Sequence, residues 1–204
     1  MKRISFLLCL TLLSFLSKAQ ELAGQTIYNT DFTIDNRPRE CLFYIPKDYN
    51  KEEKTYPLLV VLHDSGSNSK NVIKDYGDFL HATADSLQAV ILYPNAFKNS
   101  WGIANAKDSV NDVGFLSIVV EYFVQRYSFN ADKVFVAGFG QGGLMANKIG
   151  CDLPERITAI ANLSAKPNSY TCKVPALQQS AISFDAKGKV LNTTFQNMWK
   201  FFMP

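Results

Sequence analysis

The feature that most constrains the fold of this chain is a glycine-dense turn in the middle of the sequence. Residues Lys133 to Gly143 read K-V-F-V-A-G-F-G-Q-G-G, so an apolar run leads directly into a cluster of glycines. Glycine permits backbone conformations and close approaches that a side chain would prevent. The pattern predicts a buried strand that turns sharply into a helix, with Gly140 in the middle of the turn.

The same residues have the frame of a catalytic turn but lack its hydroxyl group. In the G-x-S-x-G nucleophile elbow, a serine stands above the sheet between two glycines. Here the frame is Gly138-Phe139-Gly140-Gln141-Gly142, with glycine in place of the serine. The pentapeptide by itself fits equally well an ordinary strand–helix turn that needs small residues.

Several other segments follow one another in an order that indicates a family. They are Pro57–Gly66, Val90–Asn95, Ser100-Trp101, Asn111–Leu116, Tyr127–Val136 and Gly142–Ala146. Together with the glycine frame, this series resembles the secreted polyhydroxybutyrate depolymerase and feruloyl esterase family of α/β-hydrolases. The resemblance covers roughly Arg39 to Asp185 and implies a carboxylic ester hydrolase by descent.

The apolar pattern predicts an α/β protein with a mostly parallel sheet covered by helices on both faces. Continuous apolar runs such as Leu58–Leu62 are typical of strands buried on both sides. Strands are expected near Thr26–Ile34, Cys41–Ile45, Leu58–Leu62, Ala89–Tyr93, Val134–Ala137, Ala159–Leu163 and Leu177–Phe184, and helices near Ser69–Ser86, Asp112–Tyr127, Gln141–Gly150 and Asn192–Phe202.

The resemblance makes this the three-layer α/β-hydrolase fold, with the last strand and histidine loop of the family missing. About 185 mature residues suit one domain, expected over residues 20–204 and incomplete at its C-terminus. The expected edge strand Leu177–Phe184 then lacks a neighbour. Because open apolar edges recruit other chains, edge-to-edge self-association is expected.

The first 19 residues predict a secretory signal peptide. A basic start is followed by the apolar run Ile4–Leu16 and a small-x-small cleavage site ending at Ala19. Cleavage removes three of 21 basic residues, so 21 − 3 = 18 remain against 18 acidic residues. The mature chain is therefore expected to be secreted or periplasmic and nearly neutral, with neither nucleic acid nor membrane as a partner.

Three cysteines remain after cleavage, in a compartment where disulfides persist. The resembled family has cysteines at the places of Cys151 and Cys172, which implies that these two are paired. The closed loop of ~20 residues would contribute about 3 kcal/mol. Cys41 lies in a strand-like stretch and is expected to be a buried hydrophobe. No spacing of cysteine and histidine indicates a metal, and no cofactor is expected.

Ester hydrolysis in this fold needs a nucleophile, a histidine base, an orienting carboxylate and two N–H donors. The resemblance puts the nucleophile at Gly140 and the carboxylate at Asp185, although the His-Gly usual before that aspartate is absent. An ordinary loop carboxylate is the alternative for Asp185. The only histidines, His63 and His81, lie upstream of the elbow. His63 is expected to hold the oxyanion turn through backbone hydrogen bonds, and His81 to lie on a helix surface.

The oxyanion hole is built from backbone, so it is expected to survive. Its candidate donors are the N–H of Gln141 and one N–H from Asp64 or Ser65. Asp64 replaces a glycine common in the resembled family, and its carboxylate would oppose developing negative charge. The hydroxyls of Ser65 and Ser100 fit turn residues better than nucleophiles, because no histidine is placed to take their protons.

The cleft is expected beside His63, Ser100 and Trp101. Trp101 fits either the floor of an aromatic or sugar-binding site or ordinary packing. Asp112 starts a helix, where capping alone would explain an acidic residue. The partners implied by the resemblance are a polyester, a feruloylated glycan or another small ester.

Three functions remain open from the sequence. The first is a catalytically inactive homologue that binds polymer or glycan fragments. The second is a truncated remnant without function. The third is an active ester hydrolase with a relocated nucleophile, which two missing triad members disfavour.

Overall fold

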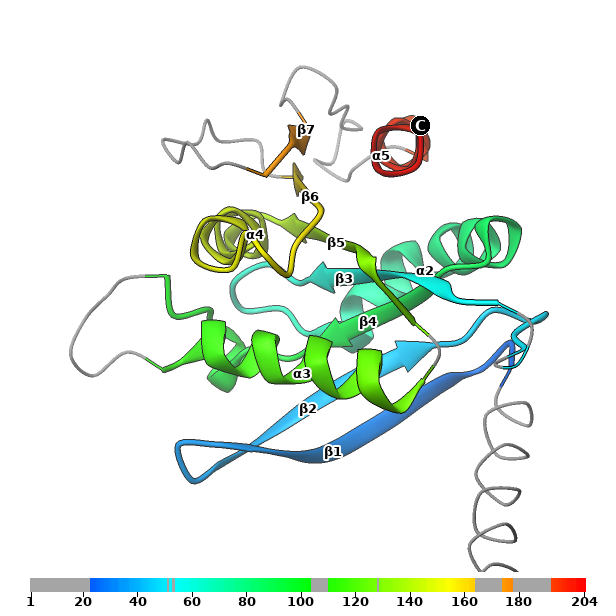
Figure 1. Cartoon of the computed structure of the whole chain (residues 1–204). Coiled ribbons are helices and arrows are strands. Elements are labelled where there is room, and N and C mark those ends of the chain that lie inside the picture. Colours follow the sequence, from blue (N-terminus) through cyan, green and yellow to red (C-terminus); the bar gives the residue numbers. More distant parts are fainter. Residues whose placement is uncertain are drawn as a thin grey trace, which may run out of the picture.

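The computed structural model describes residues 23–50, 52, 54–103, 110–127, 129–163, 174–177 and 192–204. Within this part the chain forms a sheet with the strand order β1-β2-β4-β3-β5-β6-β7 (Figure 1). The strands are β1 (Thr26–Ile34), β2 (Arg37–Tyr44), β3 (Tyr56–Leu62), β4 (Val90–Pro94), β5 (Phe129–Phe139), β6 (Ala159–Leu163) and β7 (Ala176–Leu177). The helices are α2 (Ser69–Leu87), α3 (Asp112–Arg126), α4 (Gln141–Asp152) and α5 (Asn192–Phe202), with a short 3₁₀ helix η1 (Phe97–Asn99).

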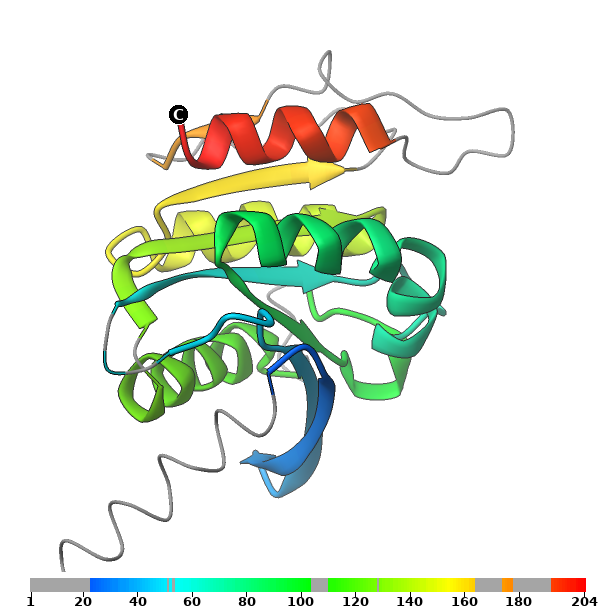
Figure 2. The same ribbon diagram turned by 90° about the vertical axis from the view of Figure 1, so that its right-hand side faces the viewer.

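The sheet is mostly parallel, as the alternation of segments predicts. β1 and β2 form an antiparallel hairpin, and β2 is also antiparallel to β4. The remaining pairs, β4–β3, β3–β5, β5–β6 and β6–β7, are parallel. Helices cover both faces of the sheet (Figures 1 and 2), so the predicted three-layer α/β fold is confirmed.

The central strand shows why its sequence is apolar throughout. Leu58, Val60 and Leu62 belong to the core under α3 and α4, whereas Leu59 and Val61 belong to the core under α2 and α5. All seven residues of β3 are buried. A strand with helices on both sides has no solvent-facing row, which removes the polar alternation seen in half-buried strands.

The helix expected at the end of the chain forms and is packed. In α5, Phe195 lies 5.4 Å from the ring of Phe79, and Phe202 stacks on Phe135 at 4.7 Å. Within α5 the side chains of Phe195, Met198, Trp199 and Phe202 are buried. Residues 178–191 lie outside the described part, so the strand expected over Leu177–Phe184 is described only at β7, and edge association remains a prediction.

Two strands begin at least four residues earlier than the sequence indicates. β5 starts at Phe129, which lies opposite Tyr56 of β3, although the apolar run begins at Val134. β2 starts at Arg37 because the hairpin turn at Asp35 and Asn36, both with positive φ, brings its first residues beside β1. Pairing with a neighbouring strand overrides local polarity here.

The parallel strands place three loops at one edge of the sheet. β3, β4 and β5 run in the same direction, so the turns after Leu62, Pro94 and Phe139 meet at their carboxyl ends. Ligand sites of open α/β sheets are found at this edge. In the described part, no helix has the length and apolar character needed to cross a membrane. The predicted signal peptide, residues 1–19, lies outside that part.

Candidate active-site region

The turn between β5 and α4 has a backbone that requires glycine. Gly140 adopts φ 49° and ψ −117°, a region that side chains rarely occupy. A Cβ on Gly138 would lie 2.1 Å from the carbonyl oxygen of Gly142, and one on Gly142 would lie 2.5 Å from the carbonyl oxygens of Leu62 and His63. Because Gly138 and Gly142 lack a Cβ, the start of α4 can pack closely against the end of β5 and against the end of β3.

Two of the backbone N–H groups considered as donors, those of Gln141 and Ser65, converge on a side chain of this protein. Ser65 N–H and Gln141 N–H each donate to Oδ1 of Asp64, both at 2.7 Å. Among the candidate residues, Asp64 is therefore an acceptor, and Ser65 and Gln141 are the donors that bind it. From the sequence, a carboxylate at Asp64 is expected to disfavour a negatively charged oxygen nearby. In the structure the Asp64 carboxylate itself accepts the hydrogen bonds of the two N–H groups.

Asp64 also fills the space of the missing side chain at the tip of the elbow. A Cβ built on Gly140 would lie 2.1 Å from Cγ and Oδ1 of Asp64 and 2.2 Å from Oδ2. Carbon atoms at such distances collide. The aspartate at position 64 and the glycine at position 140 are therefore sterically linked. This link depends on the contact between two segments that are distant in the sequence.

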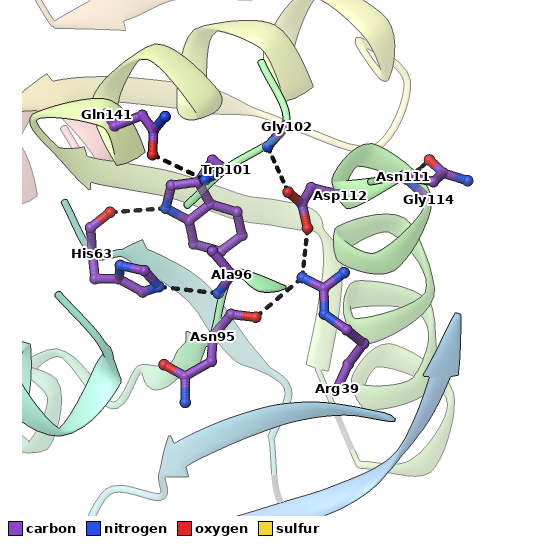
Figure 3. A network of polar contacts seen from close by, with 10 residues as sticks. All are labelled: Arg39, His63, Asn95, Ala96, Trp101, Gly102, Asn111, Asp112, Gly114 and Gln141. Atoms are coloured by element: carbon purple, nitrogen blue, oxygen red, sulfur yellow. Dashed lines mark hydrogen bonds and ion pairs between the residues drawn. The ribbon is translucent and has the colours of Figure 1, made fainter. Parts of the chain in front are cut away.

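His63 holds the oxyanion turn from inside the protein (Figure 3). Its Nδ1 lies 2.7 Å from the carbonyl oxygen of Asp64, and its Nε2 lies 3.0 Å from the backbone nitrogen of Ala96. Because a carbonyl oxygen accepts and a backbone N–H donates, Nδ1 carries the proton and Nε2 accepts. The ring is fully buried, and burial lowers its pKa. With both nitrogens engaged, His63 cannot take a proton from a nucleophile at the surface.

Trp101 binds both the His63 backbone and the side chain of Gln141. Its indole Nε1–H donates to the carbonyl oxygen of His63 at 2.8 Å, and its backbone N–H donates to Oε1 of Gln141 at 2.9 Å (Figure 3). Trp101 is 3% exposed, so its ring packs and cannot serve as an open aromatic platform. Ser100 is exposed, and its Oγ lies 3.3 Å from the side-chain amide of Gln141, with no histidine among its hydrogen-bond partners.

A buried ion pair lies behind the loop after β4, and its formation corrects the prediction for Asp112. Asn111 is the residue that caps α3, accepting from Gly114 N–H at 2.8 Å. Asp112 instead binds Nη2 of Arg39 at 2.5 Å and accepts from Gly102 N–H at 2.6 Å. Arg39 and Asp112 are 73 positions apart, so local sequence patterns give no sign of the pair.

The guanidinium of Arg39 ties three segments together. Its Nη2 also donates to the carbonyl oxygen of Asn95 at 3.1 Å, and its Cζ lies 3.9 Å from the ring centre of Phe115. Burial lowers the pKa of Arg39, while the adjacent Asp112 opposes that effect. The pair therefore fixes β2, the loop after β4 and the start of α3 relative to one another (Figure 3).

His81 does not lie on the helix surface as the sequence suggests. Its ring stacks on Tyr44 with the ring centres 3.9 Å apart, and it meets the edge of Tyr93 at 6.0 Å. The face of α2 that bears His81 is turned towards the sheet, where the residue is half-buried. Burial lowers the pKa of His81. Its ring partners, Tyr44 and Tyr93, belong to β2 and β4 and not to the turn between β5 and α4.

The two histidines should make folding stability depend on pH. Their folded-state pKa values lie below that of a free histidine, so protons bind the unfolded state more readily. Stability should be fully present above about pH 7 and should fall as pH drops below about 6.5. Urea denaturation at several pH values would measure this, and His81→Phe, which keeps the stacked ring, should reduce the slope. An unchanged slope in His81→Phe would contradict the shift assigned to His81.

Other candidate residues are either structural or outside the described part. Cys41 is a free thiol and fully buried, and burial raises its pKa. Asp185 and Cys172 fall in residues that the structure does not describe, so the acid position and the pairing of Cys172 with Cys151 stay predictions. Within the described residues no cluster of side chains could hold a metal ion.

A pocket of about 400 Å³ opens at the same edge of the sheet, between the start of β2 and the loop after β4. It is lined by Pro38, Arg39, Glu40 and residues 95–99. Lys98 and Asn99 in this loop have positive φ, of 52° and 58°. The carbonyl of Asn99 accepts from Gly66 N–H at 2.9 Å, which joins the pocket wall to the oxyanion turn. Local sequence patterns do not predict this pocket, because its walls come from two segments that are distant in the chain.

In sequence, the chain is similar to a polyester depolymerase and to esterases. The chain is 30% identical over 158 residues to a poly(3-hydroxybutyrate) depolymerase of Ralstonia pickettii, covering 71% of this chain and 32% of that relative. It is 28% identical over 132 residues to a probable feruloyl esterase C of Aspergillus niger, covering 62% and 46%. The chain thus spans between about a third and a half of the length of these relatives. No family model matches.

Solved structures agree on the fold. A ferulic acid esterase superimposes with a TM-score of 0.60 at 22% identity, over 70% of this chain and 61% of that one. An acetyl xylan esterase from Aspergillus awamori superimposes with a TM-score of 0.58 at 16% identity, over 82% and 57%. At these identities the likeness establishes the architecture, and the residues at the site have to be considered one by one.

Proposed function

We propose that this chain, an α/β-hydrolase-fold homologue of polyhydroxybutyrate depolymerases and of feruloyl and acetylxylan esterases, binds an ester-type ligand without hydrolysing it. One observation carries the proposal: the carboxylate of Asp64 lies at the point where Ser65 N–H and Gln141 N–H converge, beside a glycine at the nucleophile position. The protein would be secreted after cleavage at Ala19, with Cys151 and Cys172 paired.

Each requirement for acyl transfer meets an obstacle at this site. Gly140 has no side chain to attack a carbonyl carbon. The donors that would stabilise the tetrahedral oxyanion already bind a carboxylate, and a second negative charge beside it would be repelled. His63 uses both ring nitrogens within the protein, so it cannot activate a serine.

The pocket beside the turn supports retention of a ligand. Its wall combines the ring of Phe97 with polar groups, which suits the mixed apolar and polar surface of an ester of an aromatic acid or a short polyester. The names of the relatives indicate poly(3-hydroxybutyrate) and feruloyl esters as their substrates. For this chain we propose a polyester or a feruloylated glycan fragment as the ligand class.

The purified mature chain should not hydrolyse p-nitrophenyl acetate or methyl ferulate above a heat-denatured control. Gly140→Ser should not restore activity, because the Asp64 carboxylate lies where the new side chain would go and His63 has both ring nitrogens engaged within the protein. Titration of methyl ferulate and a 3-hydroxybutyrate oligomer by calorimetry tests binding, and Phe97→Ala should weaken it.

Two results would contradict the proposal. Saturable turnover abolished by Ser65→Ala or Ser100→Ala would establish a hydrolase with a relocated nucleophile. Absence of binding to either compound, with the fold intact by circular dichroism, would favour a remnant without function.

A further inference from the structure

We infer that Asp64 is a built-in anion in an otherwise intact oxyanion hole, and that removing its side chain opens a binding site for small carboxylates. The inference deepens the proposed function and rests on the same site. It assigns a role to Asp64 that goes beyond the absence of a nucleophile: its carboxylate closes the hole to the carbonyl oxygen of any ester.

The geometry is that of an anion site. Two N–H donors, from neighbouring Ser65 and from Gln141, which lies 77 positions from Asp64, meet one oxygen atom, each at 2.7 Å. Gln141 is the first residue of the 12-residue helix α4, whose N-terminus carries a partial positive charge. Backbone donors at a helix start bind carboxylate and phosphate oxygens well. Here the anion that would come from a ligand comes from the chain.

The donors are held in place without help from the carboxylate. The carbonyl of Asp64 accepts from His63 Nδ1–H and, at 3.1 Å, from Ser67 N–H. On the other side, Gly143 N–H donates to the carbonyl of Gly140 at 3.0 Å. These bonds use backbone oxygens only. Truncating the side chain of Asp64 should therefore leave two N–H groups pointing at an empty site.

The carboxylate and a side chain at position 140 exclude each other. The clash distances of 2.1–2.2 Å involve all three terminal atoms of the Asp64 side chain, so no small rotation relieves them. Alanine at 140 would therefore expel the carboxylate from the hole, in addition to straining a backbone with positive φ. The Asp64 carboxylate can bind the two N–H groups in this position because Gly140 has no Cβ.

The direct test is an amide-resolved titration of ¹⁵N-labelled Asp64→Ala with sodium acetate at constant ionic strength. The Ser65 and Gln141 amide signals should shift with saturation in this variant. They should stay in place in the wild type and in Asp64→Asn, whose amide oxygen still fills the hole. Signals that do not respond in Asp64→Ala, or that respond equally in the wild type, would overturn the inference.

A double-mutant cycle provides a second test that does not depend on anion binding. Gly140→Ala should perturb the unfolding equilibrium constant at least about fivefold less in the Asp64→Ala background than in the wild type. Equal effects in the two backgrounds would overturn the steric exclusion. Neither test measures hydrolysis, so the inference can fail while the proposed lack of activity stands, and the reverse also holds.

Discussion

Replacing Asp112 with alanine should lower the free energy of unfolding by about 3–5 kcal/mol, the usual cost of breaking a buried ion pair. The side chains of Arg39 and Asp112 are 1% and 0% exposed, so the guanidinium would keep its charge in a site without a counter-ion. The N–H of Gly102 would lose its acceptor as well. Chemical denaturation followed by far-UV circular dichroism measures the change.

The control for this prediction is a more exposed pair between a basic residue and an aspartate, in which the Asp152 side chain is 41% exposed. Lys148 and Asp152 lie on α4 at i and i+4 with their charged atoms 2.9 Å apart. Removing Asp152 should cost about 0.3–0.5 kcal/mol. If Asp112→Ala were as mild as Asp152→Ala, the Arg39–Asp112 contact would not be the element that joins β2 to the start of α3.

Replacing Gly138 with alanine should destabilise the protein by about 3 kcal/mol, at the upper end of the range for overpacked sites. The new Cβ would lie 2.1 Å from the carbonyl oxygen of Gly142 and 2.6 Å from the backbone nitrogen of Gly143. Both are backbone atoms at the start of α4, so the helix would have to move away from β5. Urea unfolding of the variant and the wild type gives the difference.

Gly66→Ala separates this steric effect from that of backbone conformation. Gly66 has φ +73°, but a Cβ there would meet no atom within 4 Å. The cost should be about 1 kcal/mol, which is that of left-handed backbone alone. Equal losses in Gly66→Ala and Gly138→Ala would show that close approach at the turn is not what fixes glycine at 138.

The fold could be predicted from the sequence because its signals are local. Short stretches of sequence predict three of its elements. They are the strand over Leu58–Leu62, the glycine turn after Phe139 and the helix over Asn192–Phe202. The order of these segments then indicates the architecture through resemblance. The starts of β2 and β5 were missed because pairing with distant strands determines them.

The site could be predicted only in part, for the same reason. The motif predicts a donor at Gln141 and a second one at Asp64 or Ser65, and the structure gives Ser65 N–H the same acceptor as Gln141 N–H. That the Asp64 carboxylate would occupy the hole could not be foreseen, because it depends on the distance between two turns. Local patterns also do not predict the partners of Asp112 and His81, because Arg39 and Tyr44 come from the distant strand β2.

The contact between Asp64 and Gly140 also bears on the order in which such a site can change. Consider a chain with glycine at 64 and serine at 140, one substitution at each position away from the present pair. If aspartate comes first, its carboxylate meets the serine Cβ and has no hole to enter. If glycine comes first, the aspartate finds room and two donors. In the second order the carboxylate reaches both donors at once, and a serine regained at 140 must turn the aspartate side chain away from them.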